Sequence, residues 1–371
     1  MRVFDQVCGV DSQRCSCQTP MQSDAAVRRP GMPSNRKTGK GRRQSVLSAA
    51  AGVMAVAVMA MGCAASPKGA PAERGQSETA PTSARHDLTW GVFLPHDGQE
   101  SSDYAHVTEA AGDTPDYLMR FAALDDPVPV DGIRADLATG ATPVVALEPW
   151  QPGAGVDQPS YALRTLAAGD HDVALHRWAQ ALAAVEAPII LRFGHEMNAN
   201  WYPWAVGVNG NTAEEYVRVW HRLDRILAEH RADNVQMLWS PNVKVSGVTT
   251  PISDTFPGAE TVDLIGVSGY NWGDGEGHHW TEPAELFGAS LDELRALETT
   301  APLLISETGS AEDTSATRRK AAWIDSLMRL SARQERLLGI IWFQMDKERD
   351  WRIDSSPESA AAFRQALSEL A

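Results

Sequence analysis

Two glutamates, Glu196 and Glu307, each follow a short apolar run, in the segments PIILRFGHEM and APLLISETGS. Cleavage of a glycosidic bond with retention needs one acid to protonate the leaving oxygen and one carboxylate to attack the anomeric carbon, about 5–5.5 Å apart. A single glutamate at the end of a strand is more often a salt-bridged surface residue. Two glutamates in the same apolar context predict a pair of catalytic carboxylates.

The neighbours of the two glutamates indicate how the roles are divided. Arg192 lies four residues before Glu196, so the alternation of a strand places both side chains on one face. A fixed cation there keeps a nucleophilic carboxylate ionised. Tyr270 ends a later apolar segment, and it is either a hydrogen-bond donor to the same carboxylate or a residue that packs at the rim.

The acid of such a pair must have a raised pKa, which an aromatic and apolar environment favours. Trp201 and Trp204 follow Glu196 closely and supply that environment. We therefore predict that Glu307 is the nucleophile and that Glu196 is the acid/base. Trp201, Tyr202 and Trp204 also offer flat apolar faces of the kind on which sugar rings stack.

His195 directly precedes Glu196, and a His-Glu pair also begins the zinc-protease motif. That motif needs a second histidine four residues after the first, and this position is Ala199. The spacing therefore excludes the motif. His195 is predicted to orient a sugar hydroxyl or a carboxylate, or to be a hydrogen-bonded structural histidine.

Eight short apolar segments between residues 86 and 371 predict strands, and amphipathic stretches between them predict helices. Strands that alternate with helices pair in parallel, and eight such units in this length match a (β/α)8 TIM barrel, an α/β fold. A doubly wound open sheet is the alternative, although no glycine-rich phosphate motif follows a strand. We expect strands at 88–94, 117–124, 143–148, 189–193, 235–240, 262–268, 303–306 and 338–343, and helices at 171–186, 213–230, 315–334 and 359–370.

Functional side chains of a barrel lie where its strands end, at the C-terminal face. The predicted strands are followed by polar and aromatic residues, which chance would scatter. These residues are His96, Glu148, Pro149, Trp150, Arg192, His195, Glu196, Ser240, Pro241, Asn242, Tyr270, Asn271, Trp272, Glu307 and Trp342. We predict that they surround one substrate site.

The segments GHEMNANWYPW, LWSPN, VDLIGVSGYNWG, LISETGS and IIWFQMD resemble the family 26 glycoside hydrolases. These are retaining barrel enzymes of clan A, best known as β-mannanases. The resemblance runs from the first predicted strand to the last, and it implies the same roles for Glu196 and Glu307. It further implies His195 as the histidine before the acid, Trp201 as a substrate-stacking aromatic, Tyr270 as the nucleophile's hydrogen-bond partner and Trp342 as the floor beneath the sugar at the cleavage point.

One segment departs from the pattern of the family. Its β-mannanases carry a Trp-His-Pro type sequence after the third strand, where this chain has Glu148-Pro149-Trp150. Members that act on mixed-linkage β-glucan or other β-glycans are closer to this form. Glu148 is expected to contact a sugar hydroxyl or to form a buried salt bridge.

These observations predict a retaining endo-β-glycanase for β-1,4-mannan or a related β-glycan, with a β-1,3-1,4-glucanase as the alternative. Two alternatives belong to other classes. One is a carbohydrate-binding surface protein that has lost catalysis, and the other is a structural or polysaccharide-assembly factor. Loop shape decides among substrates, and the sequence does not specify it.

The N-terminal part has the features of a secretion signal. Residues 36–63 combine a basic cluster, an apolar run at 46–61 and small residues ending at Cys63, which predict a signal peptide with a candidate lipid-modified cysteine. Residues 64–85 are rich in Pro, Ala, Ser and Gly and predict a flexible linker before a catalytic domain at 86–371. We expect translation to start at Met21 or Met32, residues 1–35 to be a leader that is misassigned or disordered, and the protein to be secreted or a cell-surface lipoprotein.

The charge of the chain bears on its partners. Residues 1–63 hold 9 of the 33 Lys and Arg and 3 of the 48 Asp and Glu, so the remainder has 24 basic and 45 acidic residues, a net charge of −21. Such a surface repels nucleic acid and anionic membranes and suits a neutral polysaccharide. We expect membrane contact only through a lipid on Cys63. No cofactor is expected, and the glycine-rich loop at 273–280 is read as a solvated loop rather than a metal site.

Overall fold

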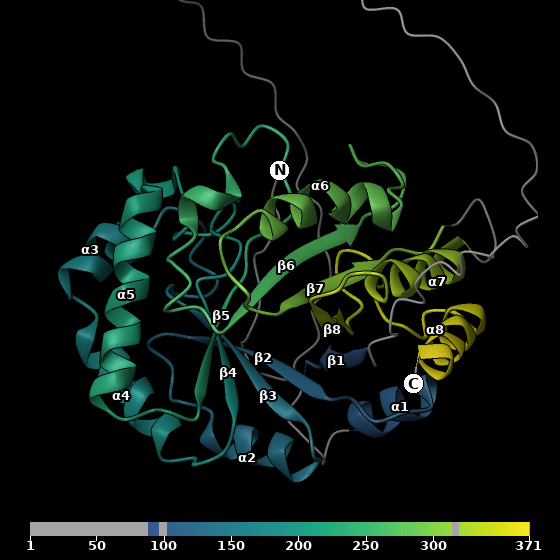
Figure 1. Ribbon diagram of the computed structural model, residues 1–371, viewed down its shortest axis with the longest axis horizontal. Helices are drawn as coiled ribbons and strands as arrows, with labels where there is room; N and C mark the ends of the chain where they lie inside the picture. Colours follow the sequence, from purple (N-terminus) through teal and green to yellow (C-terminus); the bar gives the residue numbers. More distant parts are fainter. Residues whose placement is uncertain (1–87, 96–101, 276, 314–318, 371) are drawn as a thin grey trace, which may run out of the picture. The chain divides into compact units, whose positions relative to one another are not determined.

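The computed structural model describes residues 88–95, 102–275, 277–313 and 319–370, and the structural statements below refer to these residues. Eight parallel strands pair in chain order, and the first also pairs with the last, which closes a barrel (Figure 1). The predicted (β/α)8 barrel is therefore confirmed, and the doubly wound open sheet was wrong. The predicted leader, signal segment with Cys63, linker and rim residue His96 lie outside the described residues.

The strands agree closely with the prediction except at two neighbours. They are β1 (Thr89–Phe93), β2 (Tyr117–Ala123), β3 (Thr142–Glu148), β4 (Ile189–Phe193), β5 (Val235–Trp239), β6 (Leu264–Asn271), β7 (Leu303–Ser310) and β8 (Leu337–Phe343). β6 and β7 extend past their predicted ends because they keep pairing, from Ser268 with Glu307 to Asn271 with Ser310, beyond a register shift after Val267. Glu307 consequently lies within its strand and not after it.

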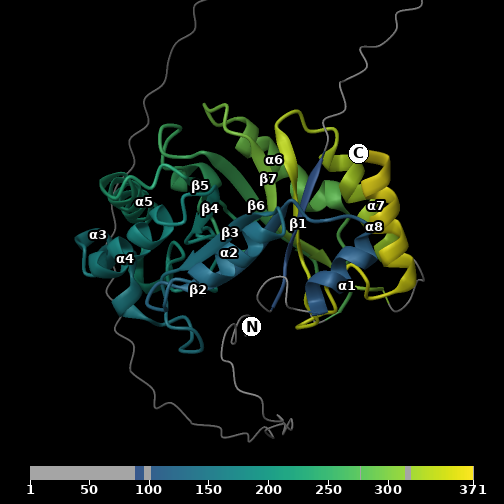
Figure 2. The same cartoon turned by 90° about the horizontal axis from the view of Figure 1, so that it is seen from below.

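Helices surround the barrel (Figure 1). They are α1 (Ser102–Ala111), α2 (Val130–Ala138), α3 (Leu163–Ala168), α4 (Asp172–Ala183), α5 (Ala213–Glu229), α6 (Pro283–Arg295), α7 (Arg319–Ser331) and α8 (Pro357–Leu370). Figure 2 shows α3, α4 and α5 along one side of the barrel and α1, α7 and α8 along the opposite side. Among the described residues, no helix has the length and apolar character needed to cross a membrane.

The connection between β5 and β6 breaks the alternation of strands and helices. Residues 240–263 contain only the short 3₁₀ turn η3 (Ile252–Thr255) in place of an α-helix. The same connection starts with the predicted rim segment Ser240-Pro241-Asn242. The barrel therefore has no covering α-helix between β5 and β6.

The apolar core has two layers, separated by the strands. An outer layer of buried side chains packs between the strands and the helices. A second set, which we call the lumen cluster, fills the interior of the barrel and consists of Phe93, Met119, Val144, Ile190, Leu238, Leu264, Leu304, Ala311, Ile341, Phe343 and Trp351. Strand alternation assigns each side chain to one layer: in β8, Ile340 and Trp342 belong to the outer layer, and Ile341 and Phe343 to the lumen.

The helix after β4 starts with a capping box. The Thr212 hydroxyl accepts a hydrogen bond from the backbone N–H of Glu215 (3.1 Å), and the Glu215 carboxylate accepts one from the N–H of Thr212 (3.0 Å). Such a cap contributes on the order of 1 kcal/mol to helix stability. It fixes where the loop from β4, which carries Glu196, must end.

Candidate active site

Arg192 lies at the centre of the barrel interior and joins four strands. Its side chain, from β4, is fully buried. The guanidinium donates to the hydroxyls of Ser240 (3.0 Å) and Ser268 (2.6 Å) and to Oε2 of Glu307 (2.5 Å). A planar fork of donors suits this arrangement better than an ammonium would. The charge of Arg192 is thereby directed at one carboxylate.

A glycine provides space for the hydroxyl groups beside the guanidinium. The hydroxyls of Ser240 and Ser306 lie 2.7 Å apart, and Ser240 also accepts from Arg192. A Cβ atom on Gly266 would lie 2.5 Å from the Ser306 hydroxyl and 2.9 Å from Cβ of Ser240. A side chain at position 266 would therefore displace this polar layer of the lumen.

Both oxygens of the Glu307 carboxylate have hydrogen-bond donors. Arg192 bonds to Oε2, and the Tyr270 hydroxyl donates to Oε1 at 2.5 Å. Burial, and after it the negative charge of Glu307, raises the pKa of Tyr270 well above its usual value, so the phenol keeps its proton. The predicted hydrogen bond from Tyr270 is thus present, and the carboxylate is fixed in one orientation.

Glu196 lies in a turn after β4 whose backbone is unusual. The strand ends at Phe193, and Gly194 and Glu196 both have positive φ, 50° and 55°. A left-handed conformation is costly for a side chain such as glutamate, and a hydrogen bond from the Glu196 N–H to the Ser240 carbonyl (2.8 Å) helps to hold it. The expectation that strand alternation relates Arg192 to Glu196 was therefore wrong, because the strand stops between them.

The environment of Glu196 raises the pKa of its carboxyl group to about 7. Burial is the main cause, and the negative charge of Glu307 adds to it. Arg192 and the hydrogen bonds from Trp201 and Ser268 act in the opposite direction. The predicted direction of this shift and its origin in a buried environment agree with the structure. Trp201 acts in the opposite direction from the one predicted, since it donates its N–H to Oε2 at 2.8 Å and so favours the charged form.

Ser268 connects the two carboxylates and was not among the site residues predicted from the sequence. Its hydroxyl accepts from Arg192 at 2.6 Å and also hydrogen bonds to Glu196. Arg192 in turn contacts Glu307, so both carboxylates belong to one hydrogen-bonded group. Ser268 lies two residues before Tyr270 in β6, and the two-residue period of a strand is the signal that could have identified it.

Glu148 and His195 form a second buried pair beside the first group. Glu148 Oε2 accepts from the Trp150 indole N–H at 3.1 Å, and Oε1 lies 3.9 Å from His195 Nε2. Burial, and then the charge of Glu307, raises the pKa of Glu148 to about 8. Burial, and then Arg192, lowers the pKa of His195 well below its usual value. Both shifts favour the uncharged form of the group, which argues against the expected alternative of a buried salt bridge for Glu148, despite the short distance.

The ring of His195 is enclosed by aromatic side chains. Its Nε2 lies 3.1 Å from the Tyr202 hydroxyl, and Nδ1 has no hydrogen-bond partner among the described residues. Tyr202 stacks on Trp204 with ring centres 4.2 Å apart, and Trp204 donates to the His195 carbonyl at 2.8 Å. Trp204 is fully buried and Tyr202 nearly so. The prediction that these two rings stack on sugar was therefore wrong, because they pack against the site from behind.

Two further tryptophans are not available to a substrate. Trp342 is fully buried in the outer layer, where it packs edge-on against Trp323 and Phe363. The expected floor beneath the sugar is therefore not Trp342, since alternation turns this residue toward the helices. Trp150 is also buried, 2% exposed, so its contact with Glu148 is structural.

Two of the predicted tryptophans remain accessible. Trp201 and Trp272 are half-buried, and Trp272 stacks on His278 with ring centres 4.8 Å apart. Trp351 joins this wall from the loop after β8, with its ring centre 4.9 Å from Tyr270 and 5.0 Å from Trp272. The segment KERDWRID around Trp351 is highly charged, so no apolar pattern indicated that it enters the lumen cluster.

Asp274 of the glycine-rich loop 273–280 contacts other residues of the chain. Asp274 accepts from the backbone N–H of Trp280 at 2.9 Å and lies 3.3 Å from the Arg319 guanidinium. Arg319 also covers the Trp280 ring at 4.2 Å. Within the described part of the chain, no group of three or more His, Cys, Asp and Glu could hold a metal ion.

Comparison with known sequences identifies one family. Residues 139–291 match the model of glycosyl hydrolase family 26. Endoglucanase H of Acetivibrio thermocellus is 31% identical over 233 residues, which are 62% of this chain and 24% of that protein. A beta-1,3-xylanase of an Alcaligenes species is 23% identical over 191 residues, 48% of this chain and 38% of that protein. The chain thus spans about a quarter to two fifths of the length of these relatives.

Solved structures share the fold at low sequence identity. A modular endo-beta-1,4-mannanase of Cellulomonas fimi superposes with a TM-score of 0.57 at 17% identity, covering 76% of this chain and 70% of that one. The GH26 beta-mannanase BoMan26A of Bacteroides ovatus gives 0.53 at 16% identity, covering 76% and 88%. At such identities these superpositions establish the barrel fold alone.

Proposed function

This chain belongs to glycosyl hydrolase family 26, and on that premise we propose that it is a retaining endo-β-glycanase with Glu307 as nucleophile and Glu196 as acid/base. Its substrate is β-1,4-mannan or a related neutral β-glycan. The observation that carries the proposal is the contrast between the two carboxylates within one hydrogen-bonded group. Glu307 is paired with a guanidinium, whereas burial raises the pKa of Glu196 to about 7.

The first step forms a glycosyl-enzyme intermediate. A Glu307 carboxylate oxygen attacks the anomeric carbon while the bond from that carbon to the leaving oxygen breaks. Glu196 gives its proton to the leaving oxygen, which departs as an alcohol. The pKa of Glu196 near neutrality suits this transfer, because an effective general acid has a pKa near the working pH.

The second step returns Glu307 to a free carboxylate and Glu196 to its protonated form. Water attacks the anomeric carbon from the side of Glu196, which takes up the proton, and the bond from the sugar to Glu307 breaks. Two inversions give net retention. Negative charge returns to Glu307 in this step, and Arg192 and Tyr270 stabilise it. Their hydrogen bonds to the two oxygens of Glu307 support that role.

The substrate contacts that we propose follow from exposure and hydrogen bonding. Trp201 is half-buried and contacts Glu196, so its ring suits a sugar next to the leaving oxygen. Trp272 offers a second partly exposed ring. Glu148 in its protonated form is a donor for a sugar hydroxyl, with His195 beside it. Sugar hydroxyls require such donors because they accept as well as donate.

The choice among β-glycans rests on the Glu148-Pro149-Trp150 segment. A buried neutral carboxyl group there gives a different donor from a histidine, which supports mixed-linkage β-glucan as the second candidate substrate. The sequence relatives named as an endoglucanase and a beta-1,3-xylanase support a broader range than mannan. We also propose that the protein is secreted or is a cell-surface lipoprotein modified at Cys63.

The decisive experiment measures hydrolysis of mannan, glucomannan, lichenan and xylan by the mature domain, with sized products. Proton NMR of the first anomer formed distinguishes retention from inversion. Glu307→Gln is expected to lower kcat by at least ~10³-fold while oligosaccharide binding persists, because only the nucleophile is lost. Glu335→Gln, at an exposed position, is the control. Full activity of the Glu307 variant would overturn its assignment as the nucleophile. Binding of glycans by the wild type without any hydrolysis would instead favour an inactive carbohydrate-binding protein.

A further inference from the structure

Three serine hydroxyls from neighbouring strands lie around the Arg192 guanidinium. They belong to Ser240, which follows β5, to Ser268 of β6 and to Ser306 of β7, and all three residues are fully buried. Nε of Arg192 donates to Ser240 at 3.0 Å, and Nη2 donates to Ser268 at 2.6 Å. The remaining nitrogen, Nη1, donates to Oε2 of Glu307. The hydroxyls therefore determine which edge of the guanidinium meets the carboxylate.

Ser306 is an extra residue in its strand. The pairing of β7 with β6 passes from Ile305 with Val267 directly to Glu307 with Ser268, so Ser306 has no partner in β6. The pairing of β7 with β8 also leaves one residue of β7 in excess within the same stretch. Such an irregularity is a β-bulge, and bulges are common beside active sites because they redirect a side chain.

The bulge explains why two consecutive side chains of β7 face the barrel interior. Leu304 belongs to the lumen cluster and Ile305 to the outer layer, so regular alternation would place Ser306 inside and Glu307 outside. Instead, the Ser306 hydroxyl lies 2.7 Å from that of Ser240, and Glu307 bonds to the buried guanidinium. The extra residue thus adds a hydroxyl to the interior without turning Glu307 outward.

We propose that Ser240 and Ser306 are positioning residues of the reaction. The inference rests on the proposed function, in which Glu307 attacks the anomeric carbon. Ser240 holds the Nε edge of the guanidinium, and Ser306 holds Ser240. The guanidinium in turn holds the carboxylate at 2.5 Å. When either hydroxyl is lost, the guanidinium turns and the attacking carboxylate turns with it.

This role predicts a loss of rate without a loss of substrate binding. Both serines are fully buried and do not contact the glycan, so KM should stay within about twofold of the wild-type value. Ser240→Ala removes a hydrogen bond to a charged group and should lower kcat about 10- to 30-fold. Ser306→Ala removes a bond between neutral hydroxyls and should lower kcat about 3- to 10-fold. The two losses should not multiply in the double variant, because both act through one contact.

The test measures the attack by Glu307 directly. The probe is a 2-deoxy-2-fluoro β-glycosyl fluoride of the sugar that the wild type hydrolyses. A carboxylate oxygen of Glu307 forms a bond to the anomeric carbon, and the bond from that carbon to fluorine breaks with release of fluoride ion. The fluorine at C2 destabilises the oxocarbenium-like transition state of hydrolysis, so the ester accumulates and mass spectrometry measures it. Since fluoride leaves without a proton, the rate constant of labelling reports on Glu307 and not on Glu196.

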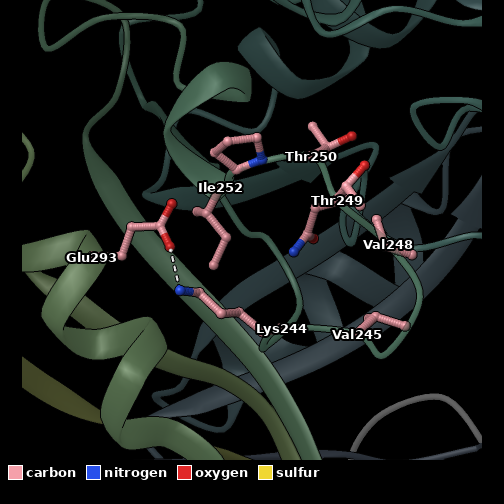
Figure 3. A pocket seen from close by; sticks show the side chains of 9 residues that line it. Lys244, Val245, Val248, Thr249, Thr250, Ile252 and Glu293 are labelled. Carbon is pink, nitrogen blue, oxygen red and sulfur yellow. Dashed lines mark ion pairs between the residues drawn. The ribbon is translucent and has the colours of Figure 1, made fainter.

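Two further variants separate positioning from folding. Ser306→Thr keeps the hydroxyl and should keep most of the wild-type rate of labelling. Ser290→Ala removes a buried hydroxyl of α6 that accepts from the backbone N–H of Lys244 at 3.2 Å. Lys244 lines a cavity of about 400 Å³ and pairs there with Glu293 of α6 (Figure 3). Ser290→Ala should destabilise the fold about as much as Ser306→Ala and leave the rate constant of labelling unchanged.

Each outcome decides the inference. Slower labelling of Ser240→Ala and Ser306→Ala that still reaches the full amount of labelled protein supports it. Labelling of both variants at the wild-type rate overturns it and assigns the hydroxyl pair to folding alone. It is also overturned if Ser290→Ala or Ser306→Thr labels as slowly as Ser306→Ala. If the wild type hydrolyses no glycan and takes up no label, or takes it up at a residue other than Glu307, the proposed function itself fails, and the inference fails with it.

Discussion

Arg192 and Lys320 are both fully buried, yet they bond to different kinds of partner. Arg192, inside the barrel, pairs with the Glu307 carboxylate and two hydroxyls. Lys320, on α7, donates to two carbonyl oxygens and one hydroxyl of the loop 350–355, at 2.7–3.0 Å. A buried cation that pairs with a carboxylate holds that charged group in place. A buried cation that bonds to carbonyls and hydroxyls holds the backbone of a loop in place.

The difference has a consequence for protonation. Burial lowers the pKa of Lys320 to about 8, and the acidic groups nearby, Glu312 foremost, offset only part of that effect. Arginine keeps its charge throughout the range in which proteins work. The pKa of the cation that holds the loop is thus lowered toward neutral pH.

Tyr270 is the place where the two cations act together. The loop held by Lys320 carries Trp351, whose ring centre lies 4.9 Å from that of Tyr270. Tyr270 in turn donates to the carboxylate that Arg192 holds. We therefore expect loss of Arg192 to damage catalysis most, loss of the Tyr270 hydroxyl less, and loss of Lys320 least.

Arg192→Met is expected to have the largest effect. It leaves Glu307 buried without its counter-ion, which costs about 3–5 kcal/mol of unfolding free energy. It also removes the group that stabilises the charge returning to Glu307, so kcat/KM should fall about 10²–10³-fold. Denaturant unfolding and initial-rate kinetics measure the two effects.

A second buried ion pair provides the matched control for that variant. Arg120 pairs with Asp136 at 2.6 Å, between β2 and α2, and both are buried. Arg120→Met should destabilise the fold by a similar amount but leave kcat/KM of the folded enzyme unchanged. Equal kinetic losses in the two variants would show that Arg192 matters only for stability.

Tyr270→Phe removes one hydroxyl and leaves the ring. A hydrogen bond to a charged group is worth about 1.5–3 kcal/mol, so kcat/KM should fall about 10- to 100-fold. Tyr216→Phe is the control, because that buried hydroxyl donates to the Phe193 carbonyl at 3.3 Å and not to a carboxylate. If Tyr270→Phe keeps the wild-type kcat/KM, Tyr270 does not connect the loop held by Lys320 to the carboxylate held by Arg192.

Lys320→Met tests whether the loop after β8 is held from outside the barrel. The change leaves two partly buried carbonyls without their donor, which costs about 2–4 kcal/mol of unfolding free energy. Displacement of Trp351 should reduce kcat about 3- to 10-fold through Tyr270. Arg329→Met, which breaks an exposed pair with Asp325, should cost less than about 0.5 kcal/mol. A destabilised Lys320 variant whose kcat equals that of the wild type would assign Lys320 to the fold alone.

The barrel could be predicted because its signals are local. Apolar runs such as 189–193 and 235–240 agree with β4 and β5 to within a residue. The ends of β6 and β7 could not be predicted, since the pairing of Ser268 with Glu307 and beyond is a non-local interaction. Because this pairing could not be predicted, Glu307 was expected after its strand and not within it.

The two glutamates and the donors Arg192 and Tyr270 could be predicted from the sequence, but other supports of the site were not. Trp351 has no distinctive local pattern, and only the fold places it next to Tyr270. Ser268 could have been identified only through the two-residue period that relates it to Tyr270 in β6. The prediction for Trp342 was wrong for a different reason. Its position at the end of a strand predicted function, whereas the face on which it lies depends on register, which a short apolar run does not reveal.

The smallest expected effect concerns pH and the pKa of Glu196 near 7. Only the protonated acid can serve the first step, so kcat/KM should decline above about pH 7. Trp201→Phe removes a hydrogen bond that favours the charged form, so the pKa rises and the decline should move to higher pH by up to ~1 unit. Lys320→Met should leave the decline in place, because Lys320 is not among the groups that shift the pKa of Glu196. A pH profile that moves downward in Trp201→Phe, or moves equally in both variants, would mean that another group than Glu196 sets the alkaline limb.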